Sequence, residues 1–261
     1  MNNVNAYDQF SEDYDRFVNW DARLAVEIPF LASELKPQKP SENGPVFVLD
    51  AACGTGQHVI ALSKLGFQCA GADYSARMIE TAQYNATVNN LEIPFKQAGF
   101  GELAEAFGKE SFDRLVCLGN SLPHVLDEVH MMQTLADFRA VLRPGGKIIF
   151  QNRNFDQVMR TRNRWMPPQT HHEGEKTWIF TRFYDFDPDG RITFNIMTLF
   201  SERGGEFQQR MISTRLWPLQ QAEMVELLER AGFTRIRFFG DLQGADYEPA
   251  ASGNLVITAQ S

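Results

Sequence analysis

The stretch Val48-Leu49-Asp50-Ala51-Ala52-Cys53-Gly54-Thr55-Gly56-Gln57 decides the fold of this chain. The apolar run at 46–50 is long enough for a buried strand, and 57–65 has the periodicity of a helix that ends at Gly66. Between them, Gly54 and Gly56 can adopt backbone angles that are closed to other residues and let a ligand approach the chain. A strand, a glycine loop and a helix in this order predict a ligand site at the carboxyl end of a strand in an open α/β sheet.

Strand and helix patterns alternate along the chain around this loop. An amphipathic helix is expected at 24–35, before a linker rich in Pro at 36–45. The pattern continues through strands at 46–50, 67–73, 92–98, 112–118 and 147–152, and through helices at 57–65, 76–85 and 127–142. The last of these helices is expected to stop at Arg143-Pro144-Gly145-Gly146. This alternation predicts a parallel sheet with helices on both faces.

The period changes after residue 152. Apolar side chains alternate at period two over 178–186, and 192–200 and 208–216 are two further expected strands joined across Gly204-Gly205, which predicts an antiparallel meander. A helix at 220–231 and two closing strands at 233–239 and 255–259 follow. The expected fold class is therefore α/β, a Rossmann-like seven-stranded sheet with helices on both faces and an antiparallel β-meander inserted as a lid.

We divide the chain into four parts on this pattern. They are an N-terminal segment and helix that contribute to the ligand site (1–45), a ligand-binding core (46–152), a lid (153–219), and a C-terminal helix with the closing strands of the core (220–261).

Composition limits the class of protein. The 261 residues are 43% hydrophobic and 22% charged, as in a folded globular chain, and the net charge of −8 argues against nucleic acid and anionic membranes. Residues 1–21 do not resemble a signal peptide, and no run approaches the ~20 apolar residues of a membrane span. Cys53, Cys69 and Cys117 give no disulfide framework and are expected to be reduced and buried. We expect a cytoplasmic protein with no nucleic-acid and no membrane partner.

The glycine loop indicates the kind of ligand. It is not the dinucleotide-binding Gly-x-Gly-x-x-Gly, because Val59 stands at the third glycine position, and no Gly-Lys-Ser/Thr of a P-loop follows. Asp73 ends the second strand, where its carboxylate can accept hydrogen bonds from two ribose hydroxyls. An adenosyl ligand without phosphates fits better than a dinucleotide, and a nicotinamide protein with a degenerate loop is the alternative.

These features resemble the class I S-adenosylmethionine-dependent methyltransferases. The resemblance rests on the loop at 50–56, on Asp73 with Ser75 and Met78 after it, and on Leu142-Arg143-Pro144-Gly145-Gly146 before the fifth strand. It implies S-adenosylmethionine as the cofactor and S-adenosylhomocysteine as the product.

Four further segments, 14–23, 117–124, 152–156 and 240–242, resemble the glycine and glycine/sarcosine N-methyltransferases. The resemblance implies that Tyr14 and Arg23 hold the methionine part of the cofactor, with Arg23 pairing its carboxylate. It implies that Asn120 and His124 line the reaction pocket and that Arg153 grips a substrate carboxylate. The cofactor-binding residues expected from the loops and from this resemblance are Tyr14, Trp20, Arg23, Ala51, Cys53, Gly54, Gly56, Asp73, Tyr74, Met78, Gly99, Phe100, Leu118 and Gly119. The expected substrate contacts are Asn120, His124, Arg153, Tyr184 and Trp217, with Asn120 and His124 as the catalytic candidates.

The chain departs from the family pattern at three places. Gly99-Phe100 stands where the family often has Asn-Trp, and Leu216-Trp217-Pro218 stands where Tyr-Tyr-Pro is common. The segment 163–168 has no counterpart. These departures leave the identity of the acceptor open.

Methyl transfer from a sulfonium is an in-line displacement, so most of the acceleration should come from holding an unprotonated amine against the methyl group, an effect of ~7–11 kcal/mol. Asn120 or a loop hydroxyl could orient the amine, and His124 could accept a proton. His124 could equally cap the turn after the fourth strand, and Arg153 could form a structural ion pair.

Other side chains have simpler interpretations. Tyr14 and Trp20 could pack the first helix on the core. His171-His172-Glu173 is expected to be a solvated loop rather than a metal site. The aromatic residues of 178–186 are expected to form the core of the meander rather than a box for a cation.

The function predicted from the sequence is methyl transfer from S-adenosylmethionine to the amino nitrogen of a small molecule, with glycine, sarcosine or another amino acid favoured by Arg153. No metal is expected, and a homo-oligomer is left open. The alternatives are an aminosugar or other small-amine methyltransferase, a nicotinamide oxidoreductase, and a non-catalytic protein that binds S-adenosylmethionine.

Overall fold

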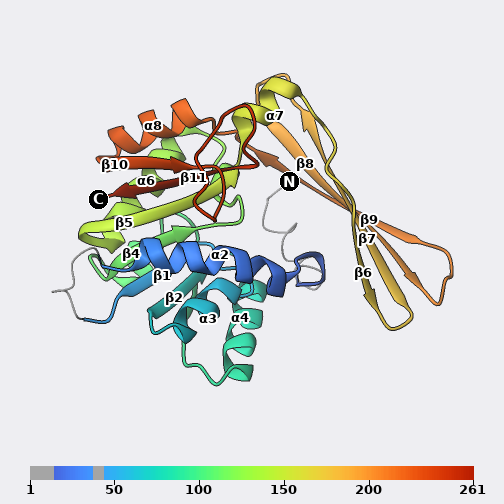
Figure 1. Ribbon diagram of the computed structural model, residues 1–261, viewed down its shortest axis with the longest axis horizontal. Coiled ribbons are helices and arrows are strands. Elements are labelled where there is room, and N and C mark those ends of the chain that lie inside the picture. Colours follow the sequence, from blue (N-terminus) through green and yellow to red (C-terminus); the bar gives the residue numbers. More distant parts are fainter. Residues whose placement is uncertain (1–14, 38–43) are drawn as a thin grey trace.

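Two sheets organise the chain in the computed structural model, which describes residues 15–37 and 44–261 (Figure 1). The larger sheet has seven strands in the order β10-β11-β5-β4-β1-β2-β3. Its strands are β1 (Phe47–Asp50), β2 (Gln68–Asp73), β3 (Phe95–Gln97), β4 (Phe112–Cys117), β5 (Leu142–Arg153), β10 (Thr234–Phe239) and β11 (Asn254–Gln260). Strands β1 to β5 pair in parallel, and β11 is antiparallel to both of its neighbours.

Helices cover both faces of the larger sheet because successive residues of each strand point to opposite sides. On one face, Val48 packs with Leu31 of α2 (Trp20–Leu35) and Leu62 of α3 (Gln57–Lys64). On the other face, Leu49 packs with Phe138 of α6 (Glu128–Val141) and Leu228 of α8 (Gln221–Arg230). The remaining helical elements are α4 (Ala76–Val88), α5 (Leu103–Phe107), the short 3-10 helix η1 (Leu122–His124) and α7 (Phe155–Thr161). The predicted Rossmann-like seven-stranded sheet is confirmed.

The second sheet is antiparallel and extends beyond the larger one as a long twisted ribbon (Figure 1). Its strands, in spatial order, are β6 (Gln169–Glu173), β7 (Lys176–Phe186), β8 (Ile192–Glu202) and β9 (Gln208–Leu216). Trp178 and Phe180 of β7 are buried against Ile196 and Ile212, so the predicted apolar core of the meander is confirmed.

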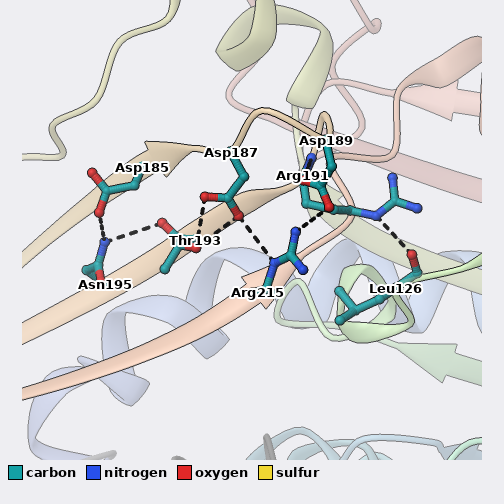
Figure 2. A network of polar contacts seen from close by, with 8 residues as sticks. All are labelled: Leu126, Asp185, Asp187, Asp189, Arg191, Thr193, Asn195 and Arg215. Atoms are coloured by element: carbon teal, nitrogen blue, oxygen red, sulfur yellow. Dashed lines mark hydrogen bonds and ion pairs between the residues drawn. The ribbon is translucent and has the colours of Figure 1, made fainter. Parts of the chain in front are cut away.

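A polar network holds one end of this ribbon together and joins it to the core (Figure 2). Arg215 of β9 pairs with Asp187 and Asp189 in the turn between β7 and β8. Next to them, Arg191 Nε donates to the carbonyl oxygen of Leu126, 2.9 Å away, in the loop that follows η1. The ribbon is thereby tied to the core close to His124.

Three local expectations are wrong. Residues 171–173 were expected to be a solvated loop, but they lie in β6, which pairs with β7, and the His171 ring lies 5.7 Å from Trp178 across the pair. Helix α6 ends at Val141, next to its expected stop at 143–146, but β5 begins at Leu142 rather than at Lys147, and Leu142 pairs with Phe112 before an irregularity in the register. Helix α7 was not predicted. It begins after Asn154, whose side chain accepts from the backbone N–H of Gln157, and it buries Phe155 completely.

The three cysteines are free, with Cys53 and Cys117 buried and Cys69 half-buried. Burial raises the pKa of Cys69 to about 11, so its thiol stays protonated at neutral pH. Within 15–37 and 44–261, no helix combines the length and apolar character that crossing a membrane requires. Tyr14 and most of the linker at 36–45 lie outside the described residues.

Candidate active site

A cavity of about 720 Å³ opens at the carboxyl ends of the parallel strands, between them and the second sheet. The predicted site residues that line it are Arg23, Ala51, Gly54, Asp73, Tyr74, Met78, Gly99, Phe100, Gly119, Asn120, His124, Arg153 and Tyr184. They come from loops after β1, β2, β3 and β4, from the end of β5, from α2, and from β7. The structure therefore brings together residues that the sequence separates by up to 161 positions.

Five predicted site residues lie outside the cavity lining. Trp20 packs edge-on against His58, and Leu118 lies in the core beneath α2. Cys53 points its thiol toward the carbonyl oxygen of Gly54, 3.7 Å away. Trp217 is buried, with its indole N–H donating to Glu223. The fifth residue, Gly56, does not line the cavity but sets the backbone conformation of the glycine loop.

Two structural constraints favour glycine at position 56, a positive φ and the close approach of two side chains. Its φ is +80°, and an added Cβ would lie 3.0 Å from Ala82 Cβ and 3.0 Å from Phe95 Cζ. A larger residue would therefore be strained and would push against α4 and β3. The tight turn lets α3 begin immediately after the loop.

Asp73 connects the second strand to the glycine loop. Its Oδ2 accepts from the Gly54 N–H at 2.8 Å, and its Oδ1 accepts from the Ser75 N–H at 2.9 Å. A carboxylate oxygen can accept more than one hydrogen bond, so these contacts orient Asp73 without using its full capacity. Asp50, on the neighbouring strand, is completely buried, and burial together with the Asp73 charge raises its pKa to about 7.

The loop after β3 lines the cavity together with Asp73. The Gly99 N–H donates to Glu102 Oε2 at 2.7 Å, and a Cβ on Gly99 would lie 3.1 Å from the Tyr74 ring. Phe100 is fixed from behind by an edge-to-face contact of 5.3 Å with Phe138. Glu102 lines the cavity but was not predicted. Its position three residues after Gly99, from where it can accept from the Gly99 N–H, could have indicated it.

Arg23 belongs to a small ionic cluster. Its Nε lies 3.0 Å from both carboxylate oxygens of Glu27, and Glu27 Oε2 lies 2.7 Å from His58 Nε2. Burial raises the pKa of Glu27, but the His58 hydrogen bond and the Arg23 charge outweigh it and lower the pKa overall. Glu27 was not predicted, and its i,i+4 spacing from Arg23 was the available signal. The cluster fixes the Arg23 side chain at the cavity wall.

The loop after β4 is held by hydrogen bonds to β5. Gly119 N–H donates to Gln151 Oε1 at 2.8 Å, and Asn120 Oδ1 accepts from the Arg153 N–H at 2.8 Å. Gln151 Nε2 in turn donates to Asn254 Oδ1 of β11 at 2.9 Å. The Arg153 N–H thus orients the carbonyl oxygen of the Asn120 amide, whose second lone pair is suited to accept from the N–H of a substrate amine. Gln151 and Asn254 both line the cavity and were not predicted.

His124 sits where η1 meets the second sheet. Its Nδ1 lies 3.4 Å from Thr214 Oγ1 of β9. Burial lowers the pKa of His124 to about 4, so the ring is neutral at pH 7. A neutral ring can accept a hydrogen bond but is a weak base, which makes proton abstraction its less favourable role.

Two guanidinium groups line the other end of the cavity. Arg153 ends β5, and Arg182 comes from β7. No carboxylate in 15–37 or 44–261 lies within ion-pair distance of either group, so Arg153 lacks the structural ion pair that was its alternative. Arg182 was not predicted. Its signal is a charged residue on the same face of the strand as the buried Phe180 and Tyr184.

Comparisons with known proteins agree with this geometry. The family described as "Methyltransferase domain" matches residues 48–146. The glycine/sarcosine N-methyltransferase of Aphanothece halophytica is 31% identical over 236 residues, which cover 90% of this chain and 82% of that protein. An S-adenosylmethionine-dependent methyltransferase structure from Clostridium acetobutylicum has a TM-score of 0.76 at 16% identity, covering 97% of this chain and 98% of that one. An amino pentose methyltransferase from Micromonospora echinaspora, solved with bound S-adenosylmethionine, has a TM-score of 0.69 at 15% identity and coverages of 97% and 96%.

The fold and these matches define a class I S-adenosylmethionine-dependent methyltransferase. Within that class the chain belongs to the glycine/sarcosine N-methyltransferase family. It is therefore an N-methyltransferase, and its cofactor is S-adenosylmethionine. The nicotinamide oxidoreductase and the non-catalytic binding protein are both set aside.

The residues present fit this cofactor. Adenosine requires apolar surface and an acceptor for ribose hydroxyls, and Tyr74, Phe100 and the Asp73 carboxylate all line the cavity. A methionine carboxylate requires a cation, and Arg23 lines the same cavity. When bound, the cofactor supplies a methyl carbon that its sulfonium leaving group activates. The individual residue assignments stay predictions.

Proposed function

We propose that this enzyme methylates the amino nitrogen of a small molecule that also carries a carboxylate, as glycine and sarcosine do. The observation that carries the proposal is Arg153, a guanidinium group in the cavity with no carboxylate partner among the described residues. Guanidinium groups bind carboxylates with paired, charge-assisted hydrogen bonds. The name of the relative from Aphanothece halophytica supports the same class of acceptor.

The roles proposed for this chain's residues are binding and orientation. Arg153 holds the carboxylate, and Asn120, fixed through the backbone of Arg153, orients the amine by accepting from its N–H at Oδ1, which leaves the amine lone pair free to attack the methyl group. Both residues meet at the end of β5, so anchor and amine contact are held in one rigid unit. Phe194 and Ile196 of β8 add apolar side chains to the lining of the same cavity. Fixing two reacting atoms in line can supply ~7–11 kcal/mol of the barrier.

The test is mass-spectrometric detection of methyl transfer from S-adenosylmethionine to a panel of acceptors. The panel contains glycine, sarcosine, dimethylglycine, other amino acids and aminosugars, and it is run on the wild type, Arg153→Gln and a control, Arg203→Gln. Arg203 is exposed in the turn after β8 and pairs only with Glu175 in the described part of the chain.

We expect turnover of at least one amino acid, with a KM about tenfold or more higher in Arg153→Gln, because a charge-assisted hydrogen bond contributes ~1.5–3 kcal/mol. The control should match the wild type. Turnover restricted to amines that lack a carboxylate, or an unchanged KM in Arg153→Gln, would overturn the proposal.

A further inference from the structure

Arg182 is the most unusual side chain in the cavity. It lies on the face of the second sheet that carries Phe180 and Tyr184, and Ile196 is its register partner on β8. Its Cζ stands 4.9 Å from the centre of the Phe17 ring. Among the described residues of this sheet that line the cavity, Arg182 is the one cation, and it lies there with Gln169, Tyr184, Phe194 and Ile196.

The charge of Arg182 has no counterpart in the described protein. Its Nε is buried without a hydrogen-bond partner, and no carboxylate there lies within ion-pair distance. Arg182 is half-buried, and leaving the buried Nε of a cation without a partner is costly, so such a group is retained where something else supplies the anion. The position of Arg182 in the lining indicates that the anion enters the cavity.

The acids of the cavity do not supply this charge. Glu27 is held by Arg23 and His58, at the α2 side of the cavity. Asp73 accepts from the backbone of the glycine loop, and Glu102 accepts from Gly99. All three carboxylates therefore already have partners, and they lie in the part of the cavity that fits the cofactor.

Arg153 adds a second cation to the lining of the same cavity, also without a carboxylate partner among the described residues. Burial and the positive charge of Arg153 lower the pKa of Arg182 to about 10. A single carboxylate would compensate one of the two charges, whereas two acidic groups would compensate both. Because Arg153 lies on the larger sheet and Arg182 on the second sheet, a molecule that contacts both bridges the two walls.

We propose that Arg153 and Arg182 form a two-guanidinium site, and that the acceptor amine filling it carries two acidic groups, as a dicarboxylic amino acid does. This inference rests on the proposed function, and it narrows the acceptor class from carboxylated amines to diacidic ones. Arg153 binds one acidic group beside Asn120, and Arg182 binds the other from the second sheet. Glycine and sarcosine would fill half of the site.

The kinetic test compares aminomalonate and aspartate with glycine as acceptors for the wild type, Arg182→Gln, Arg182→Lys and the control Arg203→Gln. We expect kcat/KM of the wild type to be about tenfold or more higher for a diacid than for glycine. Arg182→Gln should remove this preference mainly by raising KM for the diacid, Arg182→Lys should retain part of it, and the control should be unchanged. A wild type that prefers glycine, or an Arg182→Gln variant that affects both acceptors equally, would overturn the proposal.

A binding measurement separates this inference from the proposed function. Isothermal calorimetry of succinate and acetate against the folded protein requires no turnover, so it remains informative if no amino acid is methylated. Succinate should bind, acetate should bind about tenfold more weakly, and Arg153→Gln and Arg182→Gln should each remove the difference. Equal binding of the two anions, or a preference that survives in Arg182→Gln, would refute the two-guanidinium site whatever the acceptor.

Discussion

The hydroxyl of Thr55 donates to Asp15 Oδ1 at 2.7 Å. This contact joins the glycine loop to the segment that precedes α2, across 40 positions of sequence. The indole N–H of Trp20 donates to the same oxygen, also at 2.7 Å. The start of α2, and with it Arg23 one turn later, is therefore attached to the loop that shapes the cofactor end of the cavity.

We predict that Thr55→Val weakens S-adenosylmethionine binding about threefold to tenfold and lowers the free energy of unfolding by about 1–2 kcal/mol, because a buried hydrogen bond to a charged group is lost. Calorimetry and urea denaturation measure the two effects. Thr87→Val is the matched control, since the Thr87 hydroxyl bonds only within α4. Reduced stability with unchanged affinity would show that the contact does not position the site.

Substitution of Asp73 should weaken S-adenosylmethionine binding more than substitution of Thr55. We predict that Asp73→Ala weakens S-adenosylmethionine binding at least tenfold, because the variant loses the acceptors for the ribose hydroxyls and also releases the Gly54 N–H. Calorimetry on Asp73→Ala and on Glu80→Ala, an exposed acid on α4, measures the effect. An unchanged affinity for Asp73→Ala would remove Asp73 from the site.

The parallel strands could be predicted because both of their faces are buried, so they contain continuous apolar runs such as 46–49 and 115–118. Strand β6 could not be predicted in this way. Its residues are polar and mostly exposed, and only the pairing with β7 makes Gln169–Glu173 a strand. Helix α7 has seven residues, too few for a clear helical period.

The residues of the site also fall into those that a local sequence pattern predicts and those that only the tertiary structure reveals. Gly54 and Asp73 follow buried strands in a local pattern, so their position at the ligand edge could be predicted. Asn254 reaches the cavity only because β11 pairs with β5 and places it opposite Arg153, and no local pattern encodes that register. Arg182 lies in an alternating strand whose apolar neighbours indicate core, and only the tertiary structure shows that this part of the core opens into the cavity.

Trp217 illustrates the difference between lining a cavity and supporting it. Its backbone N–H donates to the Pro123 carbonyl at 2.8 Å, and the Arg191 guanidinium lies 4.5 Å from its ring. We predict that Trp217→Phe lowers the free energy of unfolding by about 2 kcal/mol, because buried volume and the indole hydrogen bond are lost. The KM for the acceptor should change less than about twofold, since the ring does not line the cavity.

Urea denaturation and steady-state kinetics test this on Trp217→Phe and on Trp165→Phe. Trp165 is 55% exposed, so its substitution should alter stability by less than about 0.5 kcal/mol. A large rise in KM with unchanged stability in Trp217→Phe would restore the substrate contact that the sequence suggested.

His124 should make the free energy of unfolding depend on pH between about 4 and 6.5. Its pKa is lowered by burial to about 4 in the folded protein, against about 6.5 for an unfolded histidine. Between these values the unfolded state binds a proton that the folded state does not, so the free energy of unfolding rises with pH across this window. Relative to His124→Asn, the wild type should lose about 2 kcal/mol of stability between pH 7 and pH 5.

Urea denaturation of both proteins at pH 5, 6 and 7 measures this difference. Asp50 contributes in the opposite direction, because burial raises its pKa to about 7 and its folded form binds the extra proton. That contribution is common to both proteins and cancels in the comparison. If the two stabilities change in parallel with pH, the His124 ring ionises in the folded protein much as it does in water, and it would then be available as a proton acceptor near neutral pH.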